Sequence, residues 1–166
     1  MNTMRDIKIA KVTINIGCGE PGEKLEKAKK LLNILTGKTI VLTSTNKRTT
    51  FGTPKGKNIG CKVTLRREDA VAFLKRAFEA AEKRLSEKCF DKQGNFSFGV
   101  KEHIDLPGVK YDPDIGIYGM DVCVTLERNG YRVSRKKIST KIGKSHIIKP
   151  EEAREWVVKN FGVNLE

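Results

Sequence analysis

Three segments of this chain alternate apolar and polar residues over most of their length, and this pattern limits the possible folds more than any other feature. The segments are 8–16, 59–66 and 120–127. A period of two places the apolar side chains on one face of a β-strand and the polar side chains on the other. Such strands predict an antiparallel sheet with one face packed and the other face open to solvent.

Helical patterns separate these strands. Apolar residues at helical spacing predict a helix over 23–35, ended by Gly37, and a longer helix over 68–88. A segment rich in β-branched residues, 39–45, predicts a further strand. The order β-α-β-β-α matches a ferredoxin-like or split βαβ plan. The expected fold class is therefore α+β, an antiparallel sheet with helices packed on one face.

The end of the chain predicts a hairpin and a short helix. Asn129 and Gly130 lie between two alternating runs, which is typical of a type I′ turn, and 131–138 is the expected return strand. Pro150 suits the first position of a final helix.

The chain length of 166 residues predicts a single domain, 1–166. This domain would carry a long basic loop at 46–58 and a basic hairpin and C-terminal segment at 128–166. The first ten residues contain three charges and no apolar stretch, so no signal peptide is expected. No run approaches the roughly 20 apolar residues that span a bilayer. We expect a soluble, cytoplasmic protein.

The net charge of +13 is sorted along the chain. No Asp or Glu lies between residues 26 and 68, a stretch with eleven Lys and Arg, or between residues 127 and 151, which holds eight. The remainder of the chain is mildly acidic. Concentrated positive charge on such a background is typical of a polyanion binder. Basic proteins without such a partner usually intersperse both signs, which makes that alternative weaker.

The polar positions of the alternating strands predict the surface that meets the polyanion. Their basic, hydroxyl and amide side chains can bind phosphate, sugar and base edges. The expected open-face residues are Lys11, Thr13, Asn15, Lys62, Thr64, Arg66 and Thr125. Phe96 and Phe98 share one side of a strand, and core packing is favoured over base stacking for them. The chain is therefore expected to recognise folded RNA by shape, through phosphate and 2′-OH contacts.

Residues 17–22 fit the pattern G-x-G-x-x-G and raise the alternative of a dinucleotide site. Glu20, however, lies where a pyrophosphate would approach, and no acidic residue follows at the distance that a ribose contact requires. A Gly-rich turn between a strand and a helix is the simpler interpretation. No catalytic constellation is visible, so we expect no enzyme and no cofactor.

The four cysteines lack the close spacing of zinc ligands, and the two histidines lie 43 residues apart. Reduced thiols are expected rather than a metal site. The cysteines are Cys18, Cys61, Cys89 and Cys123.

Five strings occur in the order and at the spacing of a known family. They are 11–20 (KVTINIGCGE), 35–37 (LTG), 58–66 (NIGCKVTLR), 94–102 (GNFSFGVKE) and 119–122 (GMDV). Over residues 8–127 the chain resembles family five of the large-subunit ribosomal proteins, which binds 5S rRNA. The basic segment after Asn129 and the missing bacterial N-terminal extension resemble the archaeal or eukaryotic branch.

The resemblance implies that the open sheet face docks on 5S rRNA in the central protuberance of the large subunit. The family's contact residues match Asn15 and Thr64, and a usual Gln is replaced by Lys38, which favours a phosphate contact there. The implied partners are 5S rRNA, large-subunit rRNA, P-site tRNA and neighbouring ribosomal proteins of the central protuberance.

The resemblance also implies that the loop 46–58 reaches the elbow of P-site tRNA. The candidates for contacts with the tRNA or rRNA backbone are Lys47, Arg48, Thr49, Lys55 and Lys57. Candidates for further rRNA contacts are Arg132, Arg135, Lys136 and Lys137. The alternatives are a generic RNA- or DNA-binding or RNA-chaperone module without 5S specificity, and a nucleotide-dependent enzyme that uses the Gly-rich turn.

Overall fold

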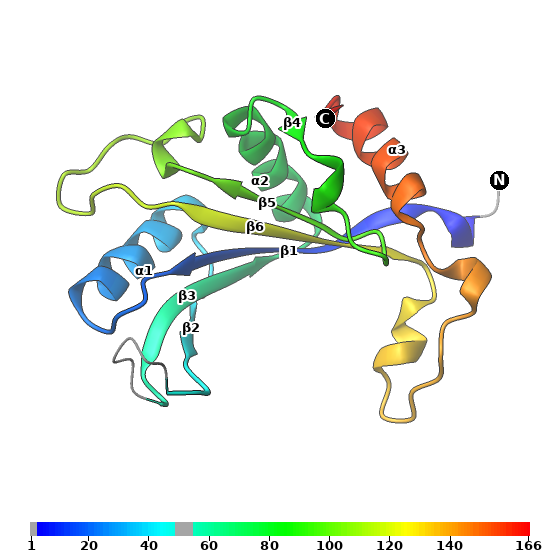
Figure 1. Ribbon diagram of the computed structural model, residues 1–166, viewed down its shortest axis with the longest axis horizontal. Helices are drawn as coiled ribbons and strands as arrows, with labels where there is room; N and C mark the ends of the chain where they lie inside the picture. The colour runs from blue at the N-terminus through cyan, green and yellow to red at the C-terminus, as the bar shows by residue number, and fades with distance from the viewer. Residues whose placement is uncertain (1–2, 49–54) are drawn as a thin grey trace.

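Five strands form one antiparallel sheet in the computed structural model, which describes residues 3–48 and 55–166 (Figure 1). The order across the sheet is β2-β3-β1-β6-β5, so β3 lies between β1 and β2 as the split βαβ plan predicts. The α+β fold class is confirmed. The strands are β1 (Ile7–Gly17), β2 (Val41–Ser44), β3 (Asn58–Leu65), β5 (Phe96–Val100) and β6 (Met120–Arg128).

Three α-helices of the described chain lie on the same side of this sheet (Figure 1). They are α1 (Glu23–Thr36), α2 (Arg67–Ala80) and α3 (Pro150–Phe161). Gly37 takes a left-handed conformation, with φ of 60°, and ends α1 as expected. Within residues 3–48 and 55–166, no helix combines the length and the apolar character needed to cross a membrane.

The remaining elements are short. A small parallel sheet joins β4 to β7, and several 3-10 helices lie in the connections. These elements are β4 (Arg84–Leu85), β7 (Asn164–Leu165), η1 (Thr3–Arg5), η2 (Glu87–Cys89), η3 (His103–Asp105), η4 (Tyr131–Arg135) and η5 (Lys144–His146).

The hydrophobic core fills the space between the sheet and the helices. Val12, Ile14 and Ile16 of β1 are fully buried, as their alternation predicts. Phe96 and Phe98 are also buried, and their rings stack on Phe78 of α2 at centroid distances of 6.2 and 5.2 Å. The prediction that these two rings pack in the core is confirmed.

The helix predicted over 68–88 ends at Ala80, so the prediction is wrong for its last eight residues. Glu82 and Lys83 take positive φ angles of 52° and 55°, which turn the chain out of the helix. Leu85 then enters β4 and pairs with Leu165. No glycine marks this turn in the sequence, and tertiary packing holds two strained residues in place.

The predicted return strand over 131–138 is absent, and the hairpin prediction is wrong. Gly130 does take the left-handed conformation that a turn requires, with φ of 97°, but the chain continues into η4. Val133 and Ile138, which would face a core in a strand, are 40% and 85% exposed. Hydrogen bonds of Tyr131, described below, instead direct this segment toward α3.

Candidate nucleic-acid interface

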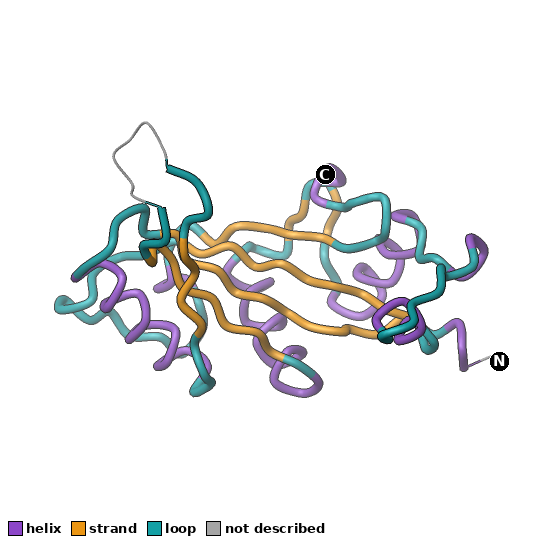
Figure 2. The backbone as a smooth tube through the Cα atoms, turned by 90° about the horizontal axis from the view of Figure 1, so that it is seen from below, coloured by secondary structure: helices purple, strands orange, loops and turns teal. Residues whose placement is uncertain are grey.

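The sheet face opposite the helices is uncovered (Figure 2). The strand register aligns its side chains in rows. One row crosses four strands and consists of Thr64, Thr13, Cys123 and Ser97. The next row consists of Lys62, Asn15, Asp121 and Gly99. Residues that stand directly opposite in neighbouring strands lie about 4.5–5.5 Å apart. The face therefore presents closely spaced hydroxyl and amide groups on a rigid support.

The predicted open-face residues of β1, β3 and β6 occupy this surface. Thr13 stands opposite Thr64, Asn15 opposite Lys62, and Lys11 opposite Thr125. None of these six side chains belongs to the buried core. Alternate residues of each strand are buried against the helices, so the residues between them must point away from the helices.

The open face is less basic than the list of predicted residues implies. Asp121 stands opposite Asn15, and Glu127 stands opposite Lys8. The carboxylate of Glu127 pairs with the guanidinium of Arg135 at 2.7 Å. The charges of Asp121, which is exposed, and of Glu127 offset the lysines of this face. The face therefore offers hydrogen-bonding groups more than net charge.

Arg66 and Lys38 lie at the margins of the sheet. Arg66 directly precedes α2, and its guanidinium donates to the carbonyl oxygen of Ala10 at 3.4 Å. Lys38 follows α1, and its ammonium lies 2.7 Å from the Asp69 carboxylate in the first turn of α2. Both cations are exposed, but Lys38 lies toward the helices and already has an acidic partner.

The segment between β2 and β3 is called here the basic loop (46–58), and its described parts, 46–48 and 55–58, lie at one end of the sheet (Figure 1). Its base is closed by two backbone hydrogen bonds: the Thr45 N–H donates to the Lys57 carbonyl, and the Gly56 N–H donates to the Thr45 carbonyl. The described candidate residues of this loop are exposed: Lys47, Arg48, Lys55 and Lys57. Thr49, another candidate, lies outside the described residues.

A second basic connection, called here the basic arm (131–147), projects from the opposite end of the sheet on the same side as the basic loop (Figure 1). The three candidates Arg132, Lys136 and Lys137 are exposed and make no ion pair within the described part of the chain. Arg135, the fourth, reaches Glu127 and ties the arm to the open face. The uncovered face thus has a cluster of cations at each end.

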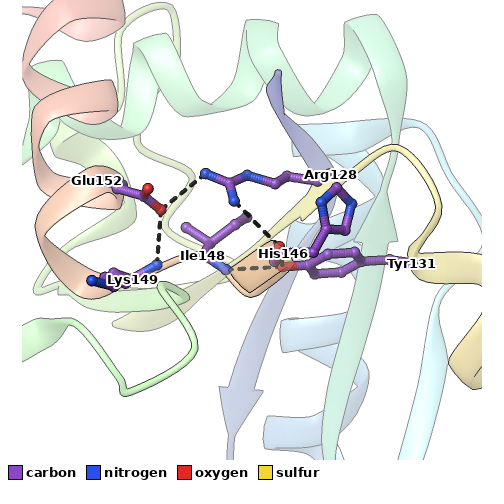
Figure 3. Close-up of polar contacts among 6 residues, drawn as sticks. All are labelled: Arg128, Tyr131, His146, Ile148, Lys149 and Glu152. Atoms are coloured by element: carbon purple, nitrogen blue, oxygen red, sulfur yellow. Dashed lines mark hydrogen bonds and ion pairs between the residues drawn. The ribbon is translucent and has the colours of Figure 1, made fainter. Parts of the chain in front are cut away.

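A network of partly buried polar contacts fastens the root of the basic arm to α3 (Figure 3). The Arg128 guanidinium donates to the Glu152 carboxylate at 2.9 Å and to the His146 carbonyl at 3.3 Å. The Tyr131 hydroxyl donates to the same carbonyl at 3.1 Å and accepts from the Ile148 N–H at 2.9 Å. These contacts explain why the chain leaves β6 for α3 instead of forming a hairpin.

Glu152 also accepts a hydrogen bond from the Lys149 N–H at the start of α3. Burial acts to raise the pKa of this carboxyl, but the Lys149 N–H and the Arg128 charge outweigh it and hold the pKa below its ordinary value. Arg128 itself is buried, so it is a structural cation and not an RNA-binding residue. The sequence indicates this burial, because residue 128 continues the series of inward-facing residues at 122, 124 and 126.

Backbone N–H groups of the Gly-rich turn after β1 are already hydrogen-bonded within the protein. The N–H groups of Cys18 and Gly19 both donate to the carbonyl of Ile59, at 2.9 and 3.1 Å. A phosphate-binding turn needs such N–H groups free and directed at the ligand. This geometry opposes the dinucleotide alternative and supports the simple strand-to-helix turn.

All four cysteines are free thiols. Burial raises the pKa of Cys61 to about 11, whereas Cys123 is exposed at the centre of the open face. Among residues 3–48 and 55–166, no group of His, Cys, Asp and Glu side chains is arranged to hold a metal ion. The thiol of Cys123 points outward, as the alternation of its strand predicts, whereas the hydroxyl of Ser97 was missed as an open-face residue although alternation places it outward too.

Comparison with known proteins adds an independent observation. Residues 58–163 match the family model of the ribosomal L5 C-terminus, and residues 2–50 match that of ribosomal protein L5. The chain belongs to the ribosomal L5 family. The resemblance expected from the sequence strings is therefore confirmed, and with it a structural ribosomal protein rather than an enzyme.

Relatives of this L5-family chain match it from end to end. The large ribosomal subunit protein uL5 of Sulfolobus acidocaldarius is 48% identical, over 99% of this chain and 93% of the relative. The uL5 protein of Pyrobaculum aerophilum is 50% identical, over 98% and 92%. That of Methanosphaera stadtmanae is 46% identical over the whole of both chains. These relatives come from archaea, in agreement with the branch that the basic C-terminal segment suggests.

Proposed function

We propose that this L5-family protein is the 5S rRNA-binding constituent of the large ribosomal subunit, and that the open sheet face is its 5S rRNA surface. The observation that carries the proposal is the registered row of Thr64, Thr13, Cys123 and Ser97 beside Lys62 and Asn15. Neutral donors and acceptors at fixed spacing suit the 2′-OH groups and sugar edges of a folded RNA.

The two ends of the face supply the electrostatic part of binding to the further RNA partners, tRNA and large-subunit rRNA. Each lysine or arginine that neutralises a phosphate releases condensed counterions, which increases affinity at low salt. The exposed cations of the basic loop and the basic arm are suited to this role because, Arg135 apart, they are not engaged in ion pairs with described residues. Hydrogen bonds from the open face would select 5S rRNA by its shape.

The basic loop is assigned to P-site tRNA and the basic arm to large-subunit rRNA. The described parts of the loop and the arm lie at opposite ends of the sheet (Figure 1), so an RNA on the centre of the open face would leave both accessible to other partners. Neighbouring ribosomal proteins of the central protuberance complete the set of partners. The protein would act in the cytoplasm as part of the ribosome.

Binding to 5S rRNA at several salt concentrations tests the proposal. Transfer RNA and an unrelated duplex of equal length serve as competitors. A specific 5S rRNA protein keeps its affinity near physiological salt and resists both competitors. Equal competition by every RNA, with affinity collapsing as salt rises, would instead indicate the generic RNA- or DNA-binding module.

A further inference from the structure

One stretch of strand β1 has an unpaired edge. Strand β6 pairs with β1 from Ile7 onward, whereas β3 pairs with it only from Val12. Beyond Leu65 the chain leaves the sheet and enters α2, so residues 7–10 have no strand beside them on that edge within the described part of the chain. An open edge presents backbone N–H and C=O groups that can pair with another extended chain.

An apolar groove runs along this edge. The groove has a volume of about 1100 Å³ and lies open to solvent between the unpaired part of β1, the first turns of α2 and the end of α3. Ile7, Ile9, Trp156 and Phe161 are half-buried and pack against the core from inside this groove. Val71 of α2 lines the opposite wall. The groove can therefore bury alternate side chains of a strand that pairs with β1.

The rim of the groove is positively charged. Arg67 and Lys75 of α2 line it, are exposed and form no ion pair with the described residues. The acidic lining residues are Glu68 and Glu127, and Glu127 is already paired with Arg135. Arg66, which donates to the Ala10 carbonyl at 3.4 Å, is the sole side chain that bonds this edge in the described structure. The excess of cations favours an acidic occupant.

We propose that this groove binds an extended, acidic segment of a partner protein, which adds a strand to β1 along residues 7–10. Its apolar side chains would alternate into the groove, and its carboxylates would approach Arg67 and Lys75. A peptide fits better than RNA because the edge offers backbone groups at the repeat of a β-strand, about 3.3 Å per residue. The groove lies on the helix-covered side of β1, and it meets the open face only at its margin, where Lys8 and Glu127 line it.

A synthetic peptide of about ten residues that alternates Val and Glu is the probe, since this length exceeds the unpaired edge. The full chain is labelled with ¹⁵N, and its amide signals are followed as the peptide is added. The proposal predicts shifts at residues 7–10 and slowed exchange of those amides among them that face the open edge, with shifts also at Val71 and Ala72.

Two forms of the peptide with N-methylated backbone amides provide the sharpest control. One form carries the methyl groups at odd positions and the other at even positions. Because a strand presents alternate amides to its neighbour, one form should lose binding while the other retains it. Equal behaviour of the two forms would overturn strand addition.

A matched pair of charge reversals tests the role of the rim. Lys75→Glu should weaken peptide binding about tenfold, whereas Lys29→Glu, an exposed lysine of α1 away from the groove, should leave it unchanged. Three results would overturn the proposal. The first is no shift at residues 7–10 at millimolar peptide, and the second is the same shifts produced by a short single-stranded RNA but not by peptide. The third is protection of this edge by self-association of the protein, measured by sedimentation. Binding of 5S rRNA should be the same in both variants, which separates this proposal from the proposed function.

Discussion

The open sheet face and the two basic segments at its ends differ in the kind of group that they present. The face carries hydroxyl and amide groups in fixed rows, and its lysines are offset by Asp121 and Glu127. The basic loop and the basic arm carry exposed cations on irregular backbone. Hydrogen-bond geometry is therefore concentrated on rigid strands, and uncompensated charge on the connections.

This separation implies that selectivity and salt dependence have different physical origins. Groups on strands are held in position before binding, which suits directional hydrogen bonds. Long, exposed lysine and arginine side chains need no exact placement to neutralise phosphates. Substitutions in the two regions should therefore change different quantities, and the following experiments use that difference.

The largest effect is expected from removing two hydrogen-bonding groups of the face. Asn15→Ala combined with Thr64→Ala should weaken 5S rRNA binding about a hundredfold, from roughly 3 kcal/mol of lost hydrogen bonds. The slope of affinity against salt should stay unchanged because no cation is removed. Filter binding over a range of salt concentrations measures both quantities.

The control for this variant lies in the basic loop. Lys55→Ala combined with Lys57→Ala should leave binding of isolated 5S rRNA nearly intact, since these exposed residues are assigned to another RNA. If the loop variant loses 5S rRNA and the face variant keeps it, the roles of the two regions are reversed.

The next effect concerns the attachment of the basic arm to α3. Glu152→Gln removes the carboxylate that pairs with buried Arg128, and it should destabilise the protein by about 2 kcal/mol. Urea unfolding measures the loss. Glu151→Gln, an exposed neighbour on the same helix, is the matched control and should change stability little.

The same pair of residues predicts a pH dependence. The Glu152 pKa is lower in the folded state, so its stabilising effect is present above the ordinary value of 4.5 and is lost as pH falls through the folded pKa. Glu152→Gln should remove this part of the acid sensitivity. Parallel acid titrations of the two proteins would contradict the assignment.

A smaller effect is expected from the cations of the basic arm. Arg132→Ala, Lys136→Ala and Lys137→Ala together should weaken binding of the 5S complex to large-subunit rRNA about tenfold near physiological salt. Binding of 5S rRNA itself should change little. A control that replaces Lys29, Lys88 and Lys159, exposed lysines outside both basic segments, removes the same charge. Equal losses in both triple variants would show that only net charge matters.

The smallest effect concerns stability away from both regions. Lys83 has a left-handed backbone, with φ of 55°, which costs a residue with a Cβ about 1 kcal/mol relative to glycine. Lys83→Gly should therefore stabilise the protein by about this amount and leave RNA binding unchanged. Lys75→Gly, inside α2, should have the opposite sign. Thermal unfolding of the two variants compares them.

The alternation of apolar and polar residues along the strands predicted much of the sheet and of its open face. The positions of Asn15 and Thr64 follow once Ile14 and Val63 are assigned to the core, because a strand has only two faces. The same argument, carried one step further, would have placed Arg128 inside. The acidic partner of Lys38 was not predictable, because Asp69 lies on a different helix and the pair forms only in three dimensions.

The errors occurred where tertiary contacts overrode local signals. Asn129-Gly130 indicates a hairpin, but the Tyr131 hydroxyl bonds both His146 and Ile148 and directs the chain to α3. The helix pattern of 68–88 continues past Ala80, yet Glu82 and Lys83 turn the chain without a glycine. Neither outcome could be derived from windows of neighbouring residues.

The alkylation rate of Cys123, free and bound to 5S rRNA, tests the central claim most directly. Cys123 stands between Thr13 and Ser97 in the row at the centre of the open face. Partial desolvation by the neighbouring strands and the nearby Asp121 raise the pKa of this exposed thiol, so the reaction with a maleimide is followed near pH 8 by peptide mass spectrometry. Half-buried Cys89, in η2, is the internal reference. If 5S rRNA lies on the open face, Cys123 should react at least about tenfold more slowly in the complex while Cys89 keeps its rate; an unchanged rate at Cys123 in a saturated complex would contradict the account.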